Sequence, residues 1–336
     1  MAGNRPIDRM RDSGGTMTIG DADDDSAITE MISTSEKLYC VKRRGIYAVQ
    51  IADQIDPIRA NPAISDTQQK IFSVGSDSPI VARTLLTAHR LFKKTFLGQN
   101  FDEDHAIALA LNLLEDFLAL DATRGHLEDV IESAKNGYGR TVAAKNATHL
   151  PSTKGLKQSL DSFAQKMGHI VNNLEDVAKL FYGAELSRKW IDSLARLVAE
   201  KYGEDSEFAI YMQGASEFLL LANSIRNLIE HPKADEYIAL DDFKLLPTGM
   251  IDLPAITLVR LGQENAKATV TLWMQRMVDD LVSVCEVLIA HLCGANVQPL
   301  AGFPTFVTEL PVEQRGNPIV RFSYASMMGD RIIPAG

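Results

Sequence analysis

The amino-acid sequence predicts a mainly α protein, built from antiparallel helical bundles with small β-hairpin additions. Three observations favour this fold class. Several long segments repeat apolar residues every three or four positions, which is the pattern of one buried helix face. The loops expected between these segments are short, and short loops join helices that pack antiparallel. The segments with an alternating pattern are brief and lie beside turns rich in glycine or proline, which is typical of hairpins.

The composition is that of an ordinary globular protein. The chain has 336 residues, of which 46% are hydrophobic and 23% charged, enough for a large core and two domains. Its formal net charge of −10 argues against non-specific coating of nucleic acid, although it leaves room for a local basic site. Cys40, Cys285 and Cys293 lack the spacing of metal ligands, so we expect no metal and a reducing, cytoplasmic compartment. No apolar run is long enough to span a membrane, and the N-terminus has no apolar signal core, so we expect no membrane contact.

The first half of the chain is expected to hold a tail, a hairpin and three helices. Residues 1–30 are polar and glycine-rich with an acidic cluster, which favours a disordered acidic tail. Residues 37–52 carry β-branched and aromatic residues on either side of Arg43-Arg44-Gly45 and predict a β-hairpin, followed by a connecting loop over residues 53–77. Helices are predicted over residues 79–97, 102–119 and 123–136. We expect residues 31–145 to form this β-hairpin plus helical region.

The second half is expected to form a helical bundle over residues 146–300, after a domain boundary in the 137–157 loop. Its helices are predicted at residues 155–180, 185–202, 208–231 and 265–293. A β-hairpin is inserted at residues 236–260, where apolar residues alternate and Pro254 marks an edge or a break. Residues 301–336 are expected to form a C-terminal β-hairpin extension, with strands near residues 304–310 and 318–326.

The end of the 208–231 helix gathers polar residues. Pro232 stops this helix, because the residue before a proline is pushed out of the α region, so His231 is expected at or just past the last turn. On a continuous helix, Arg226 and His231 would point about 140° apart. A break at His231 allows the imidazole to swing back toward the guanidinium.

The segment Arg226-Asn227-Leu228-Ile229-Glu230-His231 resembles the motif of the HEPN superfamily. That motif is an arginine, four to six residues and a histidine, often with a polar residue directly after the arginine, at the end of a long core helix. The resemblance covers roughly residues 207–293. It implies a small helical bundle of the kind found in toxin–antitoxin, abortive-infection and CRISPR-associated systems, and a metal-independent endoribonuclease with no cofactor.

The residue types suit RNA cleavage without metal. Histidine suits the proton transfers because its ordinary pKa lies near neutrality, which makes His231 the candidate acid or base. Arg226 would stabilise the phosphate through a bidentate hydrogen bond, and Asn227 would orient the phosphate or the imidazole. Glu230 lies four residues after Arg226, is an auxiliary residue of the site, and would partly neutralise the cation by pairing with it. Since two HEPN motifs commonly face each other, the resemblance implies a homodimer, or else an antitoxin or other protein partner.

A non-catalytic helical interaction module or dimerisation scaffold is the alternative. In that interpretation Arg226 only pairs with Glu230, and His231 caps the last carbonyl groups of the helix. The acidic balance of the chain and the added hairpins favour this view.

A second basic segment lies in the N-terminal half. Arg83 and His89 also fit the loose motif, and Arg83, Arg90 and Lys94 fall on nearly one helix face, where they could contact RNA phosphates. No helix break is expected there to bring His89 toward Arg83, so a solvated basic face is the competing interpretation. The sequence has no zinc-protease, paired-cysteine, dinucleotide-binding, P-loop or serine-hydrolase motif, so neither a metalloenzyme nor a nucleotide kinase is supported.

Overall fold

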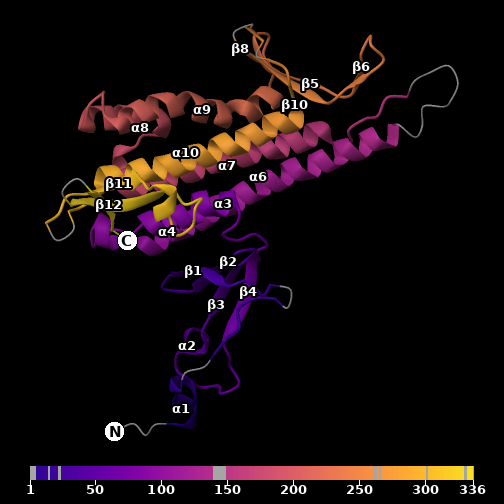
Figure 1. Ribbon diagram of the computed structural model, residues 1–336. Helices are drawn as coiled ribbons and strands as arrows, with labels where there is room; N and C mark the ends of the chain where they lie inside the picture. Colours follow the sequence, from indigo (N-terminus) through magenta and orange to yellow (C-terminus); the bar gives the residue numbers. More distant parts are fainter. Residues whose placement is uncertain are drawn as a thin grey trace. The chain divides into compact units, whose positions relative to one another are not determined.

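The computed structural model describes residues 5–13, 16–21, 24–138, 149–260, 263–264, 266–299, 302–328 and 331–335 (Figure 1). The chain forms two compact units. The first unit combines residues 1–110 with residues 297–336, and the second unit holds residues 111–296. Helix α6 (Glu103–Tyr138) begins in the first unit and continues into the second.

The mainly α prediction is wrong. The chain is 52% helical and 18% strand, and the strands of its described residues form four separate antiparallel sheets, so the fold is mixed α and β. The largest correction is at residues 28–72, where four strands pair in the order β1-β2-β3-β4. The strands are β1 (Ile28–Ser33), β2 (Leu38–Lys42), β3 (Ile46–Gln50) and β4 (Thr67–Phe72).

The two edge strands of this sheet lack the sequence pattern of a strand. The hairpin predicted at residues 37–52 is confirmed as β2 and β3, in which Leu38 pairs with Val49 and Val41 with Ile46. Strand β4 has the sequence TQQKIF, and its first four residues are exposed. Most of β1 is exposed or half-buried as well. Because these strands bury little apolar surface, no alternating apolar pattern marks them, and they were expected to be tail and loop.

The helix predicted at residues 79–97 is broken into shorter pieces. They are α3 (Pro79–Val81), the π-helix η1 (Ala82–Leu86), α4 (Thr87–Leu91) and α5 (Lys94–Leu97). The hydroxyls of Thr84 and Thr87 bond to backbone carbonyls of the preceding turn, at Ile80 and Ala82. Side-chain hydroxyls that bond to helix carbonyls compete with regular helical bonding, which fits the π-turn at this point.

The C-terminal strands complete the first unit. The sheet order is β11-β12-β13, with β11 (Thr305–Glu309), β12 (Phe322–Met328) and β13 (Arg331–Pro334). Tyr324 ties β12 to the helices: its hydroxyl donates to the carbonyl of Leu91 at 2.7 Å, and its ring stacks on Phe96 with centroids 3.9 Å apart. Through Tyr324, strand β12 therefore contacts both sides of the helix interruption between α4 and α5.

The stretch predicted as a disordered tail contains helix α1 (Pro6–Asp12). Arg11 of this helix is 6% exposed and pairs with Asp53 at 2.9 Å and Asp56 at 3.1 Å. Both acids lie in or beside helix α2 (Ala52–Ile55). Residues 1–4, 14–15 and 22–23 of the stretch lie outside the described residues.

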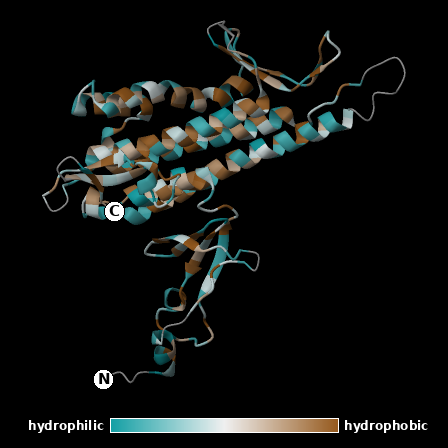
Figure 2. Cartoon of the chain, viewed as in Figure 1, coloured by the Kyte–Doolittle hydropathy of each residue, from teal (hydrophilic) through white to brown (hydrophobic). Residues whose placement is uncertain are grey.

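The second unit is a bundle of long helices with a sheet. Besides α6, its helices are α7 (Leu156–Tyr182), the short η2 (Gly183–Glu185), α8 (Trp190–Tyr202), α9 (Glu207–Glu230) and α10 (Val270–Asn296), close to the predicted ranges. Helix α9 packs against α7, α8 and α10. These helices carry hydrophobic and hydrophilic residues in alternating bands along their length (Figure 2), and the apolar positions on α7 are buried from Leu156 to Tyr182.

The strands of the second unit follow α9. They are β5 (Glu236–Asp241), β6 (Lys244–Leu245), β7 (Ile251–Asp252), β8 (Ala255–Arg260), β9 (Gln263–Glu264) and β10 (Ala268–Thr269). Strand β5 pairs antiparallel with β8, as predicted for the 236–260 hairpin.

Helix α6 joins two segments that were expected to be separate helices. The polar stretch around residue 121 interrupts the apolar pattern. Arg124 bridges it by pairing with Asp121 and Glu128, each at 2.8 Å, one turn before and one turn after. Such pairs on one helix face support a helix where apolar contacts are sparse. Among the described helices, none is both long and apolar enough to cross a membrane.

Candidate functional site

The helix end that resembles the HEPN motif has the backbone geometry expected from the sequence. Helix α9 ends at Glu230, and His231 is its C-cap residue, with φ −130° and ψ 63°. The amide of His231 donates to the carbonyl of Asn227 at 2.8 Å. Pro232 therefore ends the helix at the predicted residue.

The side chains at this helix end are open to solvent. Arg226 is 50% exposed, and its Nε donates to the Glu230 carboxylate at 3.1 Å. Asn227 and His231 are exposed as well. No hydrogen bond or ion pair joins Arg226 to His231 in the part of the chain that the structure describes. The structure brings Arg226 and Glu230 together, and it leaves the imidazole separate from both.

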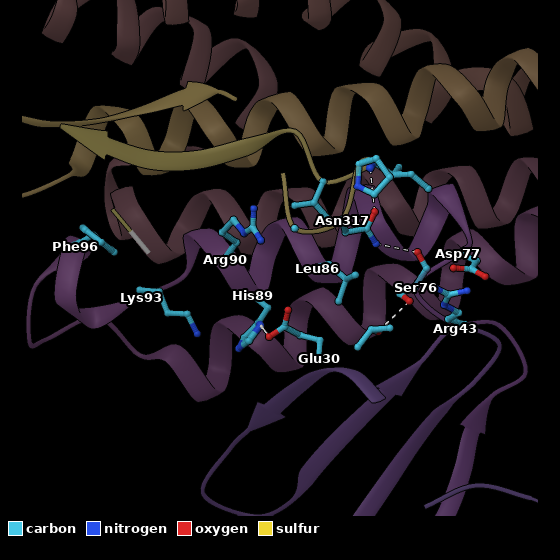
Figure 3. Close-up of a pocket in the computed structure, with 15 residues that line it drawn as sticks. Glu30, Arg43, Ser76, Asp77, Leu86, His89, Arg90, Lys93, Phe96 and Asn317 are labelled. Atoms are coloured by element: carbon cyan, nitrogen blue, oxygen red, sulfur yellow. Dashed lines mark hydrogen bonds and ion pairs between the residues drawn. The ribbon is translucent and has the colours of Figure 1, made fainter. Parts of the chain in front are cut away.

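A second candidate site is a cavity in the first unit, with a volume of about 580 Å³ (Figure 3). We call it the cationic cavity. It is lined by Thr29, Glu30, Arg43, Ser76, Asp77, Leu86, His89, Arg90, Lys93, Phe96 and residues 316–320. These residues come from β1, from the turn between β2 and β3, from the segment before α3, from the helices up to α5, and from the loop before β12.

The turn between β2 and β3 places Arg43 in the lining. Gly75 lies against the backbone of this turn, and a Cβ atom there would be only 2.7 Å from the Gly45 nitrogen and nearer still to the Lys42 carbonyl oxygen, so only glycine fits. The next two amides donate to the turn, Ser76 to the Lys42 carbonyl at 2.9 Å and Asp77 to the Arg43 carbonyl at 3.2 Å. This backbone pairing holds one wall of the cavity.

The broken helix supplies the opposite wall. His89, Arg90 and Lys93 lie within about 100° of one another at helical spacing, because residues four positions apart share a helix face. Helix α4 ends at Leu91, just before Lys93, and all three side chains line the cavity. Figure 3 shows the Lys93 side chain extending toward His89.

The loop at residues 316–320 forms a third wall and is held by two side chains. Arg315 donates to the carbonyls of Leu310 at 2.7 Å and Pro318 at 3.0 Å. Asn317 donates to the carbonyl of Ser76 at 3.0 Å and accepts from the amide of Ile319 at 2.9 Å. Because both the nitrogen and the oxygen of the Asn317 side-chain amide are hydrogen-bonded within the first unit, this wall is fixed by the fold itself.

The cavity carries more positive than negative charge. Its cations are Arg43, Arg90 and Lys93, and its acids are Glu30 and Asp77. Within the described residues, none of the three cations makes a hydrogen bond or an ion pair through its side chain. Arg90 and Lys93 are half-buried, whereas Arg43 is exposed. A half-buried cation without a partner is uncommon, since burial of a charge is costly unless the charge is paired.

Two groups in the cavity have lowered pKa values. Burial lowers the pKa of Lys93, and the carboxylates of Glu103 and Glu30 offset only part of that effect. Burial also lowers the pKa of His89 to about 4, helped by the nearby charges of Lys93 and Arg90. The imidazole of His89 is therefore neutral at pH 7, although its Nδ1 lies 3.7 Å from the Glu30 carboxylate. Perturbed groups gathered in one cavity are typical of functional sites.

The basic residues predicted in this region are separated by the structure. Arg90 lines the cavity, whereas Arg83 is not among the lining residues and Lys94 is exposed at the start of α5. Sequence reasoning missed Arg43 and Lys93 as site residues. Lys93 directly precedes Lys94 in the same basic run, so that run was the signal available for it. Arg43 carried no signal, because its place beside the helices depends on the tertiary fold.

Among the described residues, no group of three or more His, Cys, Asp or Glu side chains is arranged to hold a metal ion. Cys40, Cys285 and Cys293 are buried. No known protein family, curated protein or solved structure compared with the chain matches it.

Proposed function

We propose that the first unit binds a small ligand that carries a phosphate or carboxylate group, and that the ligand lies in the cationic cavity. The observation that carries this proposal is the set of three cations, Arg43, Arg90 and Lys93, that face one cavity without a partner in the described part of the chain. An anion supplies the partner that the fold leaves out. Arginine suits this role because its planar group forms two parallel hydrogen bonds to a phosphate or a carboxylate.

The rest of the lining favours a ligand that also has an apolar part. Leu86 is buried and lines the cavity together with Phe96 and Val320, which are also buried. The charged groups of the lining come from β1, from the turn between β2 and β3, from the segment before α3 and from the end of α4. Pockets with an apolar wall and a few convergent polar groups are typical of small-molecule sites.

Titration calorimetry with inorganic pyrophosphate tests the proposal. Arg90→Gln and Arg43→Gln should each weaken binding by about 1.5 to 3 kcal/mol, the usual contribution of a hydrogen bond to a charged group, which is roughly tenfold or more in Kd. Arg44→Gln is the matched control, since Arg44 is the next residue of the same turn, is 64% exposed and pairs with the exposed Asp25. Equal losses in all three variants would show a general charge effect, and the proposal would then be wrong.

A second candidate function is metal-independent RNA cleavage at the end of α9. The position of His231 beyond the last helical turn favours it, since a residue there is free of the helix face that holds Arg226. The carboxylate of Glu230 opposes it, because it occupies the guanidinium that would contact a phosphate. Catalysis at this site therefore requires that RNA displaces Glu230 from Arg226.

A further inference from the structure

The proposed ligand site contains a lysine whose surroundings suit a nucleophile. Lys93 is half-buried, lines the cationic cavity, and makes no hydrogen bond or ion pair with another described residue. Its neighbour Lys94 is exposed and does not line the cavity. The two residues have the same side chain one position apart, yet only one of them faces the anion-binding groups.

We propose that Lys93 forms a Schiff base with an anionic aldehyde or 2-oxo acid bound in the cationic cavity, with Arg90 holding the acid group. This inference rests on the anion-binding function proposed above and adds the chemical class of the ligand. An amine in a desolvated site beside another cation is a recurring way to activate lysine toward carbonyl compounds.

The charged groups around Lys93 set how much of it is neutral. His89 and Arg90 face it from α4, Glu30 faces it from β1, and Glu103 faces it from α6. Burial favours the neutral amine, while the two carboxylates oppose it. His89 adds no charge at neutral pH. The pKa of Lys93 is lowered on balance, so the neutral amine is more abundant than in an exposed lysine.

The reaction needs no redox partner. The lone pair of the neutral Nζ attacks the carbonyl carbon, and the carbonyl oxygen takes up a proton as the C–N bond forms. The resulting carbinolamine loses its oxygen as water while the C=N bond forms. The amine loses two protons in this process and the departing oxygen gains two, so the overall change is amine plus carbonyl compound to imine plus water.

Reductive trapping of the full chain with glyoxylate and cyanoborohydride tests the inference, with the modified lysine identified by peptide mass spectrometry. We expect Lys93 to carry the main adduct, Lys93→Arg to lose it, and the matched control Lys94→Arg to keep it. Acetaldehyde, which has the same carbonyl group without the acid, should label Lys93 more slowly. Arg90→Gln should remove that preference for glyoxylate, because it removes the group that holds the acid.

The outcomes separate the inference from the function beneath it. Adducts spread evenly over surface lysines, or an adduct that persists in Lys93→Arg, overturn the Schiff base. If no Lys93 adduct forms but pyrophosphate still binds in a way that depends on Arg90, the anion site stands and only the Schiff base is overturned. If Arg90-dependent binding of pyrophosphate is absent as well, both proposals are overturned. Mapping in the unsubstituted protein decides the matter even if Lys93→Arg does not fold.

Discussion

At the residue scale, His89 links the cationic cavity to stability. Burial lowers the pKa of its imidazole to about 4 from the ordinary 6.5. The unfolded chain therefore takes up a proton at His89 between pH 6.5 and 4, while the folded chain does not. This difference in proton uptake leaves the free energy of unfolding unchanged above pH 6.5 and lowers it as pH falls below 6.5.

We expect His89→Gln to reduce the loss of stability on acidification, because glutamine does not titrate. At pH 5 the neutral His89 lowers the free energy of unfolding by about 1 to 2 kcal/mol, and the variant should not show this loss. The measurement is urea unfolding of both proteins at pH 7 and pH 5. If the two proteins lose stability in parallel, His89 is not held neutral by the cavity.

At the element scale, α1 depends on a cluster of charges. Hydrogen bonds from Arg59 and Arg11 lower the pKa of Asp53. Backbone amides of Asn61 and Ala60, together with Arg11, lower the pKa of Asp56. A carboxyl group with a lowered pKa stabilises the fold above its ordinary pKa, and that stabilisation is lost as pH falls through the lowered value.

Arg11→Ala should therefore lower the melting temperature by a few degrees at pH 6, since it leaves Asp53 and Asp56 without the guanidinium that joins them to α1. The difference from the unsubstituted protein should shrink as pH falls below 3.8, because the unfolded chain takes up protons at Asp53 and Asp56 there, while the folded chain takes them up only at the lowered pKa values. The control is Arg44→Ala, which removes an exposed pair and should leave the melting temperature unchanged. If Arg11→Ala has the same melting temperature as the unsubstituted protein at pH 6, this cluster does not hold α1 in place.

The elements also show what the sequence could predict. The long helices α7 to α10 follow from their apolar period, and the end of α9 follows from Pro232, because both signals are local. The edge strand β4 could not be predicted from pattern, since its exposed polar residues are held by backbone bonds to β3. The π-turn was missed for a related reason, since threonine hydroxyls within a helix do not by themselves determine helix type.

At the scale of the whole molecule, the net charge of the chain and the net charge of the cationic cavity have opposite signs. The chain has a formal net charge of −10, whereas the cationic cavity gathers three cations against two acids. Its residues come from positions 29 to 320, so no window of sequence contains the site. The HEPN-like segment differs from the cavity, because it is a local motif that the sequence alone could locate. Its chemistry depends on which group pairs with the Arg226 guanidinium.

The ribonuclease candidate predicts a defined set of variants. His231→Ala and Arg226→Ala should each abolish RNA cleavage without loss of fold, because both side chains are exposed at a helix end. Glu230→Gln should raise activity, since it releases the Arg226 guanidinium from its carboxylate partner. Cleavage should survive EDTA and require a homodimer, which sedimentation velocity would detect. A purified protein that cuts no RNA, with Glu230→Gln equally inactive, leaves this helix end as a structural or interaction element.

The measurement that tests the cationic cavity most directly is the position of a bound oxyanion. Tungstate is a tetrahedral dianion like phosphate, and its anomalous X-ray scattering marks its place in a crystal of the full chain. We expect the strongest peak inside the cavity, within about 3 Å of the guanidinium of Arg90 and the amine of Lys93, the usual length of a charged hydrogen bond. An empty cavity beside occupied surface sites, at a tungstate concentration that saturates those sites, would contradict the account.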